Sequence, residues 1–165
     1  MENNATARGV ASVCSMLMQD HVRFVRIIGP SSSDLSFILQ QVYRRPEIYV
    51  RSVLIEDMFF SSAQGLPGWF ANALGLYEGT EPRPSTVPNH LAEFVFLRGI
   101  SFLFIDDFHD VFLAPGGGVA RITRDINLLL TKLPSLRIVV AEASDAVTPD
   151  YPELLEWRVH SVPSI

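Results

Sequence analysis

The sequence feature that most constrains the fold is a short, uninterrupted apolar run, Phe102–Ile105, that ends in two aspartates. A strand that is apolar at every position is typical of a parallel sheet with both faces covered by helices. An amphipathic helical pattern at 119–133 and a second apolar strand pattern at 136–141 follow this run. Strand, helix and strand in this order predict a parallel unit of an α/β fold.

The two carboxylates after the run, Asp106 and Asp107, mark a candidate metal site. Ligands of open α/β sheets bind at the carboxyl ends of the strands. Mg²⁺ takes oxygen ligands and needs few of them from the protein, so a carboxylate at that edge suits a magnesium–phosphate site. The plainer alternative is that both aspartates are solvated and begin a loop.

A degenerate phosphate-binding loop lies upstream, after a predicted strand at 21–28 and before a helical pattern. The segment matches the P-loop pattern GxxxxGK[ST] at its two ends, Gly29 and Ser36. Asp34 stands in place of the second glycine, and Leu35 stands in place of the lysine. The lysine normally neutralises the terminal phosphates, and the loss of one charge-assisted contact costs about 1.5–3 kcal/mol. Tight ATP binding of the usual kind is therefore not expected.

The remaining residues of the loop keep a weaker binding role open. The groups that would contact a nucleotide are a glycine, three loop amides and a hydroxyl, from Gly29, Ser31, Ser32, Ser33 and Ser36. A purely structural interpretation is also open. Ser33 or Asp34 would suit the N-cap of the following helix, and an acid is favourable near a helix N-terminus.

The order of these parts resembles TniB and TnsC, the AAA+ ATPases that regulate DNA transposition, with MuB a more distant relative. The resemblance rests on three segments, FLFIDDFHDVFL at 102–113, INLLLTKL at 126–133 and LRIVVAEASDA at 136–146. His109 stands where the family has a histidine after its acidic pair. WFANALGL at 69–76 is similar to the helix before the family's variable loop. The resemblance covers about residues 22–162 and implies a P-loop NTPase core.

The resemblance also implies roles for individual residues. Asp106 corresponds to the Walker B acid that associates with magnesium, and Asp107 to the catalytic glutamate, with a carboxylate shorter by one methylene. A base must reach its water within about 3 Å, so this change argues against hydrolysis. The polar sensor position corresponds to Ala143, with Ser144 as a candidate substitute. Arg158 falls near an arginine of the family that could act in trans as an arginine finger, and its alternative is an ordinary surface ion pair.

The composition predicts a single globular domain, 1–165, in the cytoplasm. The 165 residues are 48% hydrophobic and 19% charged, which is enough for one sizeable core. No apolar run reaches the length of a membrane span, and the single cysteine, Cys14, fits a reducing compartment. Residues 1–9 are small and polar, without a signal-peptide pattern, and are predicted to be disordered ahead of a helix at 10–20.

The net charge of −5 argues against a strong general DNA-binding surface, because nonspecific affinity comes from neutralised phosphates. A local DNA contact stays open, but basic residues near helix ends more simply complement the helix dipoles. These basic residues are Arg44, Arg45, Arg121, Arg124, Lys132 and Arg137. The four histidines show no metal-ligand spacing.

The rest of the chain supplies the remaining elements. Pro46 should end the first core helix, and residues 49–55 read as the next strand. A helix at 87–98, a helix at 150–157 and a strand at 158–162 complete the pattern. An aromatic-rich region is predicted to pack into the core rather than to form a partner surface, and it comprises Phe59, Phe60, Trp69 and Phe70.

Together these observations predict a three-layer α/β sandwich, with a parallel sheet of about five strands and helices on both faces. This is the core of an AAA+ fold without its helical lid, and the strand that ends at Asp106 is expected beside the strand that precedes the loop. The expected function is that of a non-catalytic, TniB-like adaptor without a cofactor. Its partners would be proteins, such as a transposase, a targeting subunit, an intact paralogue or further copies of itself.

Two alternatives remain open from the sequence. One is a weakened NTPase that binds ATP and Mg²⁺, with a neighbouring subunit supplying the missing positive charge. The other is a module that inhibits assemblies of an intact paralogue. Leu35 and Asp34 favour the adaptor, whereas Asp106, Asp107 and Ser36 favour the NTPase. The missing lid fits either a minimal form of the fold or a fragment.

Overall fold

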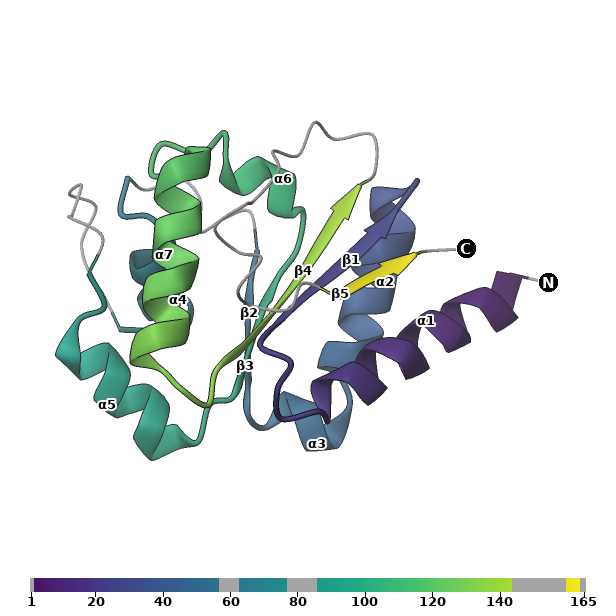
Figure 1. Cartoon of the computed structure of the whole chain (residues 1–165), viewed down its shortest axis with the longest axis horizontal. Coiled ribbons are helices and arrows are strands. Elements are labelled where there is room, and N and C mark those ends of the chain that lie inside the picture. The colour runs from purple at the N-terminus through teal and green to yellow at the C-terminus, as the bar shows by residue number, and fades with distance from the viewer. Residues whose placement is uncertain (1, 57–62, 77–85, 144–159, 164–165) are drawn as a thin grey trace.

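A parallel β-sheet between two layers of helices forms the core of the protein (Figure 1). The computed structural model describes residues 2–56, 63–76, 86–143 and 160–163. The strands pair in the order β2-β3-β4-β1-β5, and every pairing is parallel. Their bounds are β1 (Phe24–Gly29), β2 (Ser52–Ile55), β3 (Phe102–Ile105), β4 (Arg137–Ala143) and β5 (His160–Pro163). The predicted parallel α/β architecture is confirmed.

Each face of the sheet has its own hydrophobic cluster and its own helices. One cluster joins the sheet to α1 (Glu2–Leu17), α2 (Ser32–Tyr43) and α3 (Pro46–Tyr49). The other joins it to α4 (Leu66–Ala73), α5 (Asn89–Arg98), α6 (Phe108–Val111) and α7 (Val119–Lys132). No helix in the described ranges is both long and apolar enough to span a bilayer.

The burial of β3 on both faces of the sheet explains why its sequence is apolar at every position. All four of its residues are buried. Because successive side chains point to opposite faces, Phe102 and Phe104 enter the cluster under α1 and α2, whereas Leu103 and Ile105 enter the cluster under α4 and α7. The predicted strand and its bounds are confirmed, and so is its burial on both faces.

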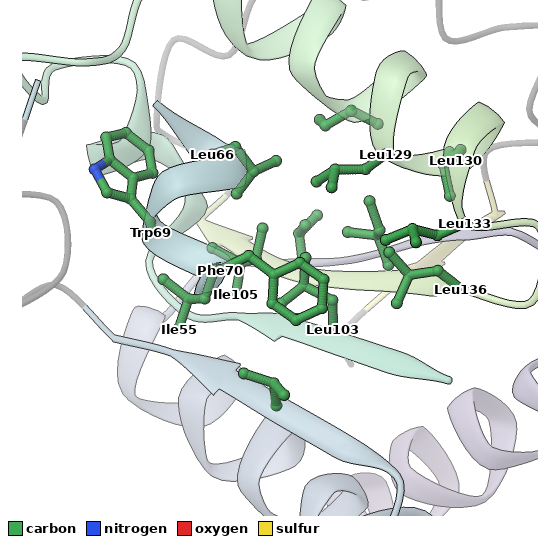
Figure 2. Packing of buried hydrophobic residues seen from close by; sticks show 14 of the residues in the cluster. Ile55, Leu66, Trp69, Phe70, Leu103, Ile105, Leu129, Leu130, Leu133 and Leu136 are labelled. Atoms are coloured by element: carbon green, nitrogen blue, oxygen red, sulfur yellow. The ribbon is translucent and has the colours of Figure 1, made fainter. Parts of the chain in front are cut away.

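Helix α7 is held by an apolar stripe and by a cation at its end. Ile122, Ile126 and Leu129 are fully buried at helical spacing, and Figure 2 shows Leu129 in one cluster with Leu66 and Phe70 of α4. Burying each leucine contributes about 1.5–3 kcal/mol. At the carboxyl end of the helix, the Arg23 guanidinium donates to three backbone carbonyls, those of Leu136 at 2.7 Å, Leu130 at 2.9 Å and Leu133 at 3.0 Å. Of these, the Leu130 carbonyl lies in the last turn of α7, where carbonyls have no partner within the helix, whereas Leu133 O also accepts from the Leu136 amide at 2.9 Å.

The position of β3 in the sheet differs from the prediction. The strand that ends at Asp106 is not beside β1, because β4 lies between them and pairs with both. Helix α7 carries the chain from β3 back to the sheet, and the returning strand occupies the position next to β3 on the side of β1. Gly29 at the end of β1 therefore faces Ala143 of β4 rather than a residue of β3.

Two local predictions are also wrong. Residues 2–9 are helical rather than disordered, because α1 begins at Glu2. Gly9 lies where α1 approaches α2, since a Cβ there would lie 3.3 Å from Ile38 Cδ1. The predicted strand at 49–55 is shorter, because Pro46 starts the short helix α3 at a position that proline favours, and β2 begins only at Ser52.

Candidate functional site

The candidate site lies at the carboxyl edge of the sheet, where the predicted loop and the predicted acidic pair come together. The Ser36 hydroxyl, on the second turn of α2, donates a hydrogen bond of 2.8 Å to Asp106 Oδ1, just after β3. This bond reaches past β4, which separates β1 from β3. The structure therefore brings together two of the sequence-predicted residues, from positions 70 apart in the chain.

The connection between β1 and α2 is much shorter than a phosphate-binding loop. Strand β1 ends at Gly29 and α2 begins at Ser32, so that Pro30 and Ser31 alone lie between them. Ser31 is the N-cap, and its Oγ accepts a hydrogen bond from the Asp34 amide at 3.4 Å. The predicted cap at Ser33 or Asp34 is wrong, because the helix starts earlier than the motif spacing suggests.

This early start places the predicted amide donors in a helical turn instead of a loop. Pro30 has no backbone N–H, and the amides of Ser32 and Ser33 belong to the first helical turn instead of an open loop. The Ser33 hydroxyl is hydrogen-bonded to Ser31 Oγ at 2.8 Å. Asp34 is exposed in the first turn, where a negative charge is favourable for the helix dipole but unfavourable for a bound phosphate.

Leu35, at the position of the P-loop lysine, is a core residue. It is 1% exposed and belongs to the cluster beneath α1 and α2. Its side chain therefore faces the sheet rather than the carboxyl edge. A lysine here would place an ammonium group in an apolar environment, so the missing charge could not be restored by this substitution alone.

Asp107 turns the chain away from the sheet immediately after Asp106. It adopts the left-handed conformation, with φ 44° and ψ 50°, which aspartate tolerates better than most residues. Its amide donates to Asp106 Oδ1 at 3.0 Å. One oxygen of Asp106 thus accepts two hydrogen bonds, from the Ser36 hydroxyl and from the Asp107 amide. This arrangement orders the Asp106 carboxylate through contacts within the protein.

The donor atoms at this site fit magnesium by their chemistry but not by their arrangement. Asp106 and Ser36 are oxygen donors of the kind that Mg²⁺ uses. Their side chains, however, are hydrogen-bonded to each other, so a metal ion would have to break that bond to use both. In the described ranges, no three His, Cys, Asp or Glu residues come together as a metal site. The short connection between β1 and α2 and the buried Leu35 also do not fit a nucleoside triphosphate.

The other sequence candidates that the structure describes lie outside this arrangement. His109 contacts Asp110 at 3.3 Å between Nε2 and Oδ1. Ala143 ends β4 without a polar side chain and is 8% exposed. Ser144 and Arg158 lie outside the described residues. Trp69 and Phe70 are fully buried, as predicted, whereas Phe59 and Phe60 also fall outside the described ranges.

Two buried acids were missed by the sequence reasoning. Glu142, 1% exposed near the end of β4, forms an ion pair of 2.6 Å with Arg26 of β1. Asp125 is fully buried on α7, and its Oδ2 accepts a hydrogen bond of 3.1 Å from the Leu66 amide at the start of α4. For Glu142 the signal was a charged residue within an apolar strand pattern, whereas Asp125 stands among other charged residues of its helix and gave no such signal.

No protein-family model matches the chain, and no curated protein matches it.

Proposed function

We propose that the chain is a non-catalytic, AAA+-like core that acts by binding protein partners, in the manner of a TniB-like adaptor in DNA transposition or a related mobile-element system. One observation carries the non-catalytic part of this proposal. At the position of the P-loop lysine, Leu35 is buried in the core, and α2 begins at Ser32, so the segment forms a helix start rather than a phosphate cradle.

The Ser36–Asp106 hydrogen bond supports the same proposal. In a working P-loop NTPase, the equivalent hydroxyl and carboxylate serve the magnesium ion and its phosphates. Here they satisfy each other at 2.8 Å and connect α2 to the end of β3. We therefore assign the pair a structural role, in which it holds α2 against the end of β3.

The sheet topology is compatible with the resemblance to AAA+ proteins. Its order places one strand, β4, between the strand before the loop and the strand that ends in the acid. This differs from the dinucleotide-binding and flavodoxin-like orders of parallel sheets. The topology supports a P-loop-like ancestry of the fold, whereas the site residues support loss of its chemistry.

Exposed apolar side chains on α5 support a protein-binding role. Phe96 and Leu97 are consecutive residues near the end of this helix, and they are 83% and 80% exposed. Single exposed apolar residues are normal, but neighbouring ones favour a contact surface. The binding proposal rests on these two residues together with the inactive site.

Calorimetric titration with ATP and Mg²⁺ tests the non-catalytic part. The proposal expects no binding heat up to millimolar ATP. It also expects that Ser36→Ala and Asp106→Ala lower the thermal unfolding midpoint, because each removes the same hydrogen bond. Micromolar binding of ATP by the wild-type chain, lost in Asp106→Asn, would instead establish the alternative, a weakened NTPase that a neighbouring subunit completes.

The adaptor part needs a binding measurement. An integrase-like transposase encoded beside this chain, if present, is the partner to test by titration with purified proteins. The expected result is binding that is unaffected by ATP and weakened by Phe96→Ser or Leu97→Ser. The matched control is Phe37→Ser on α2, since Phe37 is 54% exposed and belongs to the opposite layer of helices. Equal weakening in all three variants would contradict a role for α5.

A further inference from the structure

A hollow of about 570 Å³ opens at the amino-terminal edge of the sheet, the edge opposite Ser36 and Asp106. The end of α1, the helix α3 and the residues at the starts of the central strands line it. Its apolar lining includes Leu17, Ile48 and Phe102, which are buried. The candidate site described above shares no residue with this hollow.

Three arginines at the wall of the hollow stand at the starts of three strands of the sheet, of which β4 and β1 are adjacent and β2 is separated from β4 by β3. Arg51 precedes β2, Arg137 begins β4 and Arg23 precedes β1. Backbone hydrogen bonds connect the row through β3. The Phe102 amide donates to Arg51 O at 3.1 Å, the Arg137 amide donates to Ser101 O at 2.8 Å, and the Ile138 amide donates to Arg23 O at 2.9 Å. Adjacent strands are about 4.8 Å apart, so Arg23 and Arg137 come from adjacent positions, and Arg51 comes from a position about twice that distance from Arg137.

The three guanidinium groups differ in how far the fold already uses them. Arg23 is committed to the carbonyls at the end of α7. Arg51 donates to Ser101 Oγ at 2.6 Å and to Gly99 O at 3.3 Å, which leaves its Nη1 without a partner in the described ranges. Among the residues that the structure describes, the Arg137 guanidinium donates to Asp20 alone, at 3.2 Å.

Arg137 is the least satisfied of the three. Its side chain is 18% exposed, and its Nε is buried without a hydrogen-bond partner among the residues that the structure describes. The Asp20 side chain that it contacts is fully exposed, and exposed ion pairs contribute little. The guanidinium also lies 5.7 Å from the centre of the Phe102 ring, which fixes its position without satisfying its donors.

The charges around the hollow favour an anion. Three guanidinium groups face two carboxylates, Asp20 and Glu47, and both of these acidic residues are exposed. Burial and, secondarily, the nearby charge of Arg137 lower the pKa of Arg23, as expected where positive charges are incompletely compensated. The carbonyls at the end of α7 would repel an anion, but Arg23 covers them.

We propose that this hollow binds a small oxyanion, the phosphate or carboxylate group of a ligand, between the guanidinium groups of Arg137 and Arg51. A planar guanidinium presents paired donors that match two oxygens of such a group. The exposed carboxylate of Asp20 gives way to the bound anion. The hydroxyl of Ser135 lies on the same lining and offers a further donor. This site is independent of the proposed adaptor function, because it uses the opposite edge of the sheet.

The test is a calorimetric titration of the whole chain with inorganic phosphate at constant ionic strength. We expect millimolar binding by the wild-type chain and a loss of affinity of about tenfold or more in Arg137→Gln, since a charge-assisted contact is removed. The matched control is Arg124→Gln, which removes an equal charge from an exposed position on α7 outside the hollow. Its phosphate affinity should stay within about twofold of the wild type.

Two further measurements keep the result interpretable. Arg137→Lys retains the positive charge and should keep part of the affinity, which separates loss of charge from loss of folding. Titration with acetate separates the two sources of the oxyanion: tighter binding of phosphate indicates a phosphate ligand, and tighter binding of acetate indicates a carboxylate. Absence of binding heat with both anions, or equal affinities in Arg137→Gln and Arg124→Gln, would overturn the proposal.

Discussion

The Asp125 carboxylate of α7 accepts a hydrogen bond from the Leu66 amide, the first residue of α4, at 3.1 Å. Gly65, the residue before it, has a positive φ of 77° and no side-chain cap of its own, so an acid from another helix caps α4. A Cβ on Gly65 would lie 2.6 Å from Asp125 Oδ2, and the contact therefore depends on glycine. The two helices on this face are joined through a buried polar contact as well as through apolar packing.

Replacing Asp125 with alanine should destabilise the fold strongly. The change leaves the Leu66 amide without its acceptor and creates a small cavity at a fully buried position. We expect a loss of about 2–3 kcal/mol in the free energy of unfolding, measured by urea denaturation. Glu93→Ala on the exposed side of α5 is the control and should change stability by less than about 0.5 kcal/mol. Similar losses in both variants would contradict the capping role.

The buried position of Leu35 predicts a sharp contrast within one helix. Leu35→Lys should cost about 3 kcal/mol or more, because it removes apolar packing and places a charge in the core. Phe37→Lys, two positions further along α2, should cost less than about 1 kcal/mol, since Phe37 is 54% exposed. Thermal unfolding of both variants measures the difference. A stable Leu35→Lys protein that gains ATP binding would show that this side chain can reach the carboxyl edge.

The buried ion pair between Arg26 and Glu142 predicts a non-additive double variant. Arg26→Met leaves the Glu142 carboxylate, 1% exposed, without its partner and should cost about 3 kcal/mol. Glu142→Gln alone should cost a similar amount or less, because an amide can still accept from Arg26. The double variant Arg26→Met, Glu142→Leu should recover much of the loss in a double-mutant cycle. Strict additivity of the single changes would contradict direct coupling.

Cys14 offers a measurement of burial on α1. Burial raises the pKa of its thiol above the ordinary value of 9.0, despite the opposing charge of Arg45. Because the folded state favours the protonated thiol, this contribution to stability is present below the ordinary pKa and is lost as the pH rises through the raised value. Alkylation by iodoacetamide should therefore be slower than for free cysteine at pH 9.0 and should accelerate above it. Equal rates at that pH would contradict the shift.

The elements that the sequence predicted well are those whose pattern has one physical explanation. The run Phe102–Ile105 can be apolar throughout only if both faces of its strand are buried, and the structure buries all four residues. The stripe that contains Ile122 and Ile126 likewise fixes the inward face of α7. The spacing of apolar residues predicts the buried face of an element because positions on one face recur at a fixed interval along it.

The candidate site was harder to predict because it depends on where a helix starts. The spacing of Gly29 and Ser36 suggests a loop of several residues, but Ser31 caps α2 and starts it early. A motif records residue types and cannot weigh an N-cap against a loop. The Ser36–Asp106 contact was anticipated only in the sense that both residues were assigned to one edge of the sheet.

The long-range polar pairs could not be predicted at all from local pattern. Arg26 and Glu142 lie 116 positions apart, and their contact requires the register between β1 and β4. The strand order that creates this register was predicted wrongly, because the sequence suggested that β3 would lie beside β1. A charge inside an apolar strand signals that a partner exists, but it does not say on which element.

The insertion of β4 between β1 and β3 has a consequence for synthesis on the ribosome. Both neighbours of β1 in the sheet, β4 and β5, lie more than 100 residues later in the chain. The amino-terminal strand therefore emerges long before any strand that can pair with it, while β2 and β3 can pair earlier. The nascent chain must keep an apolar strand unpaired until residues 137–143 leave the exit tunnel, which makes the interval before β4 the period of greatest exposure to misassembly.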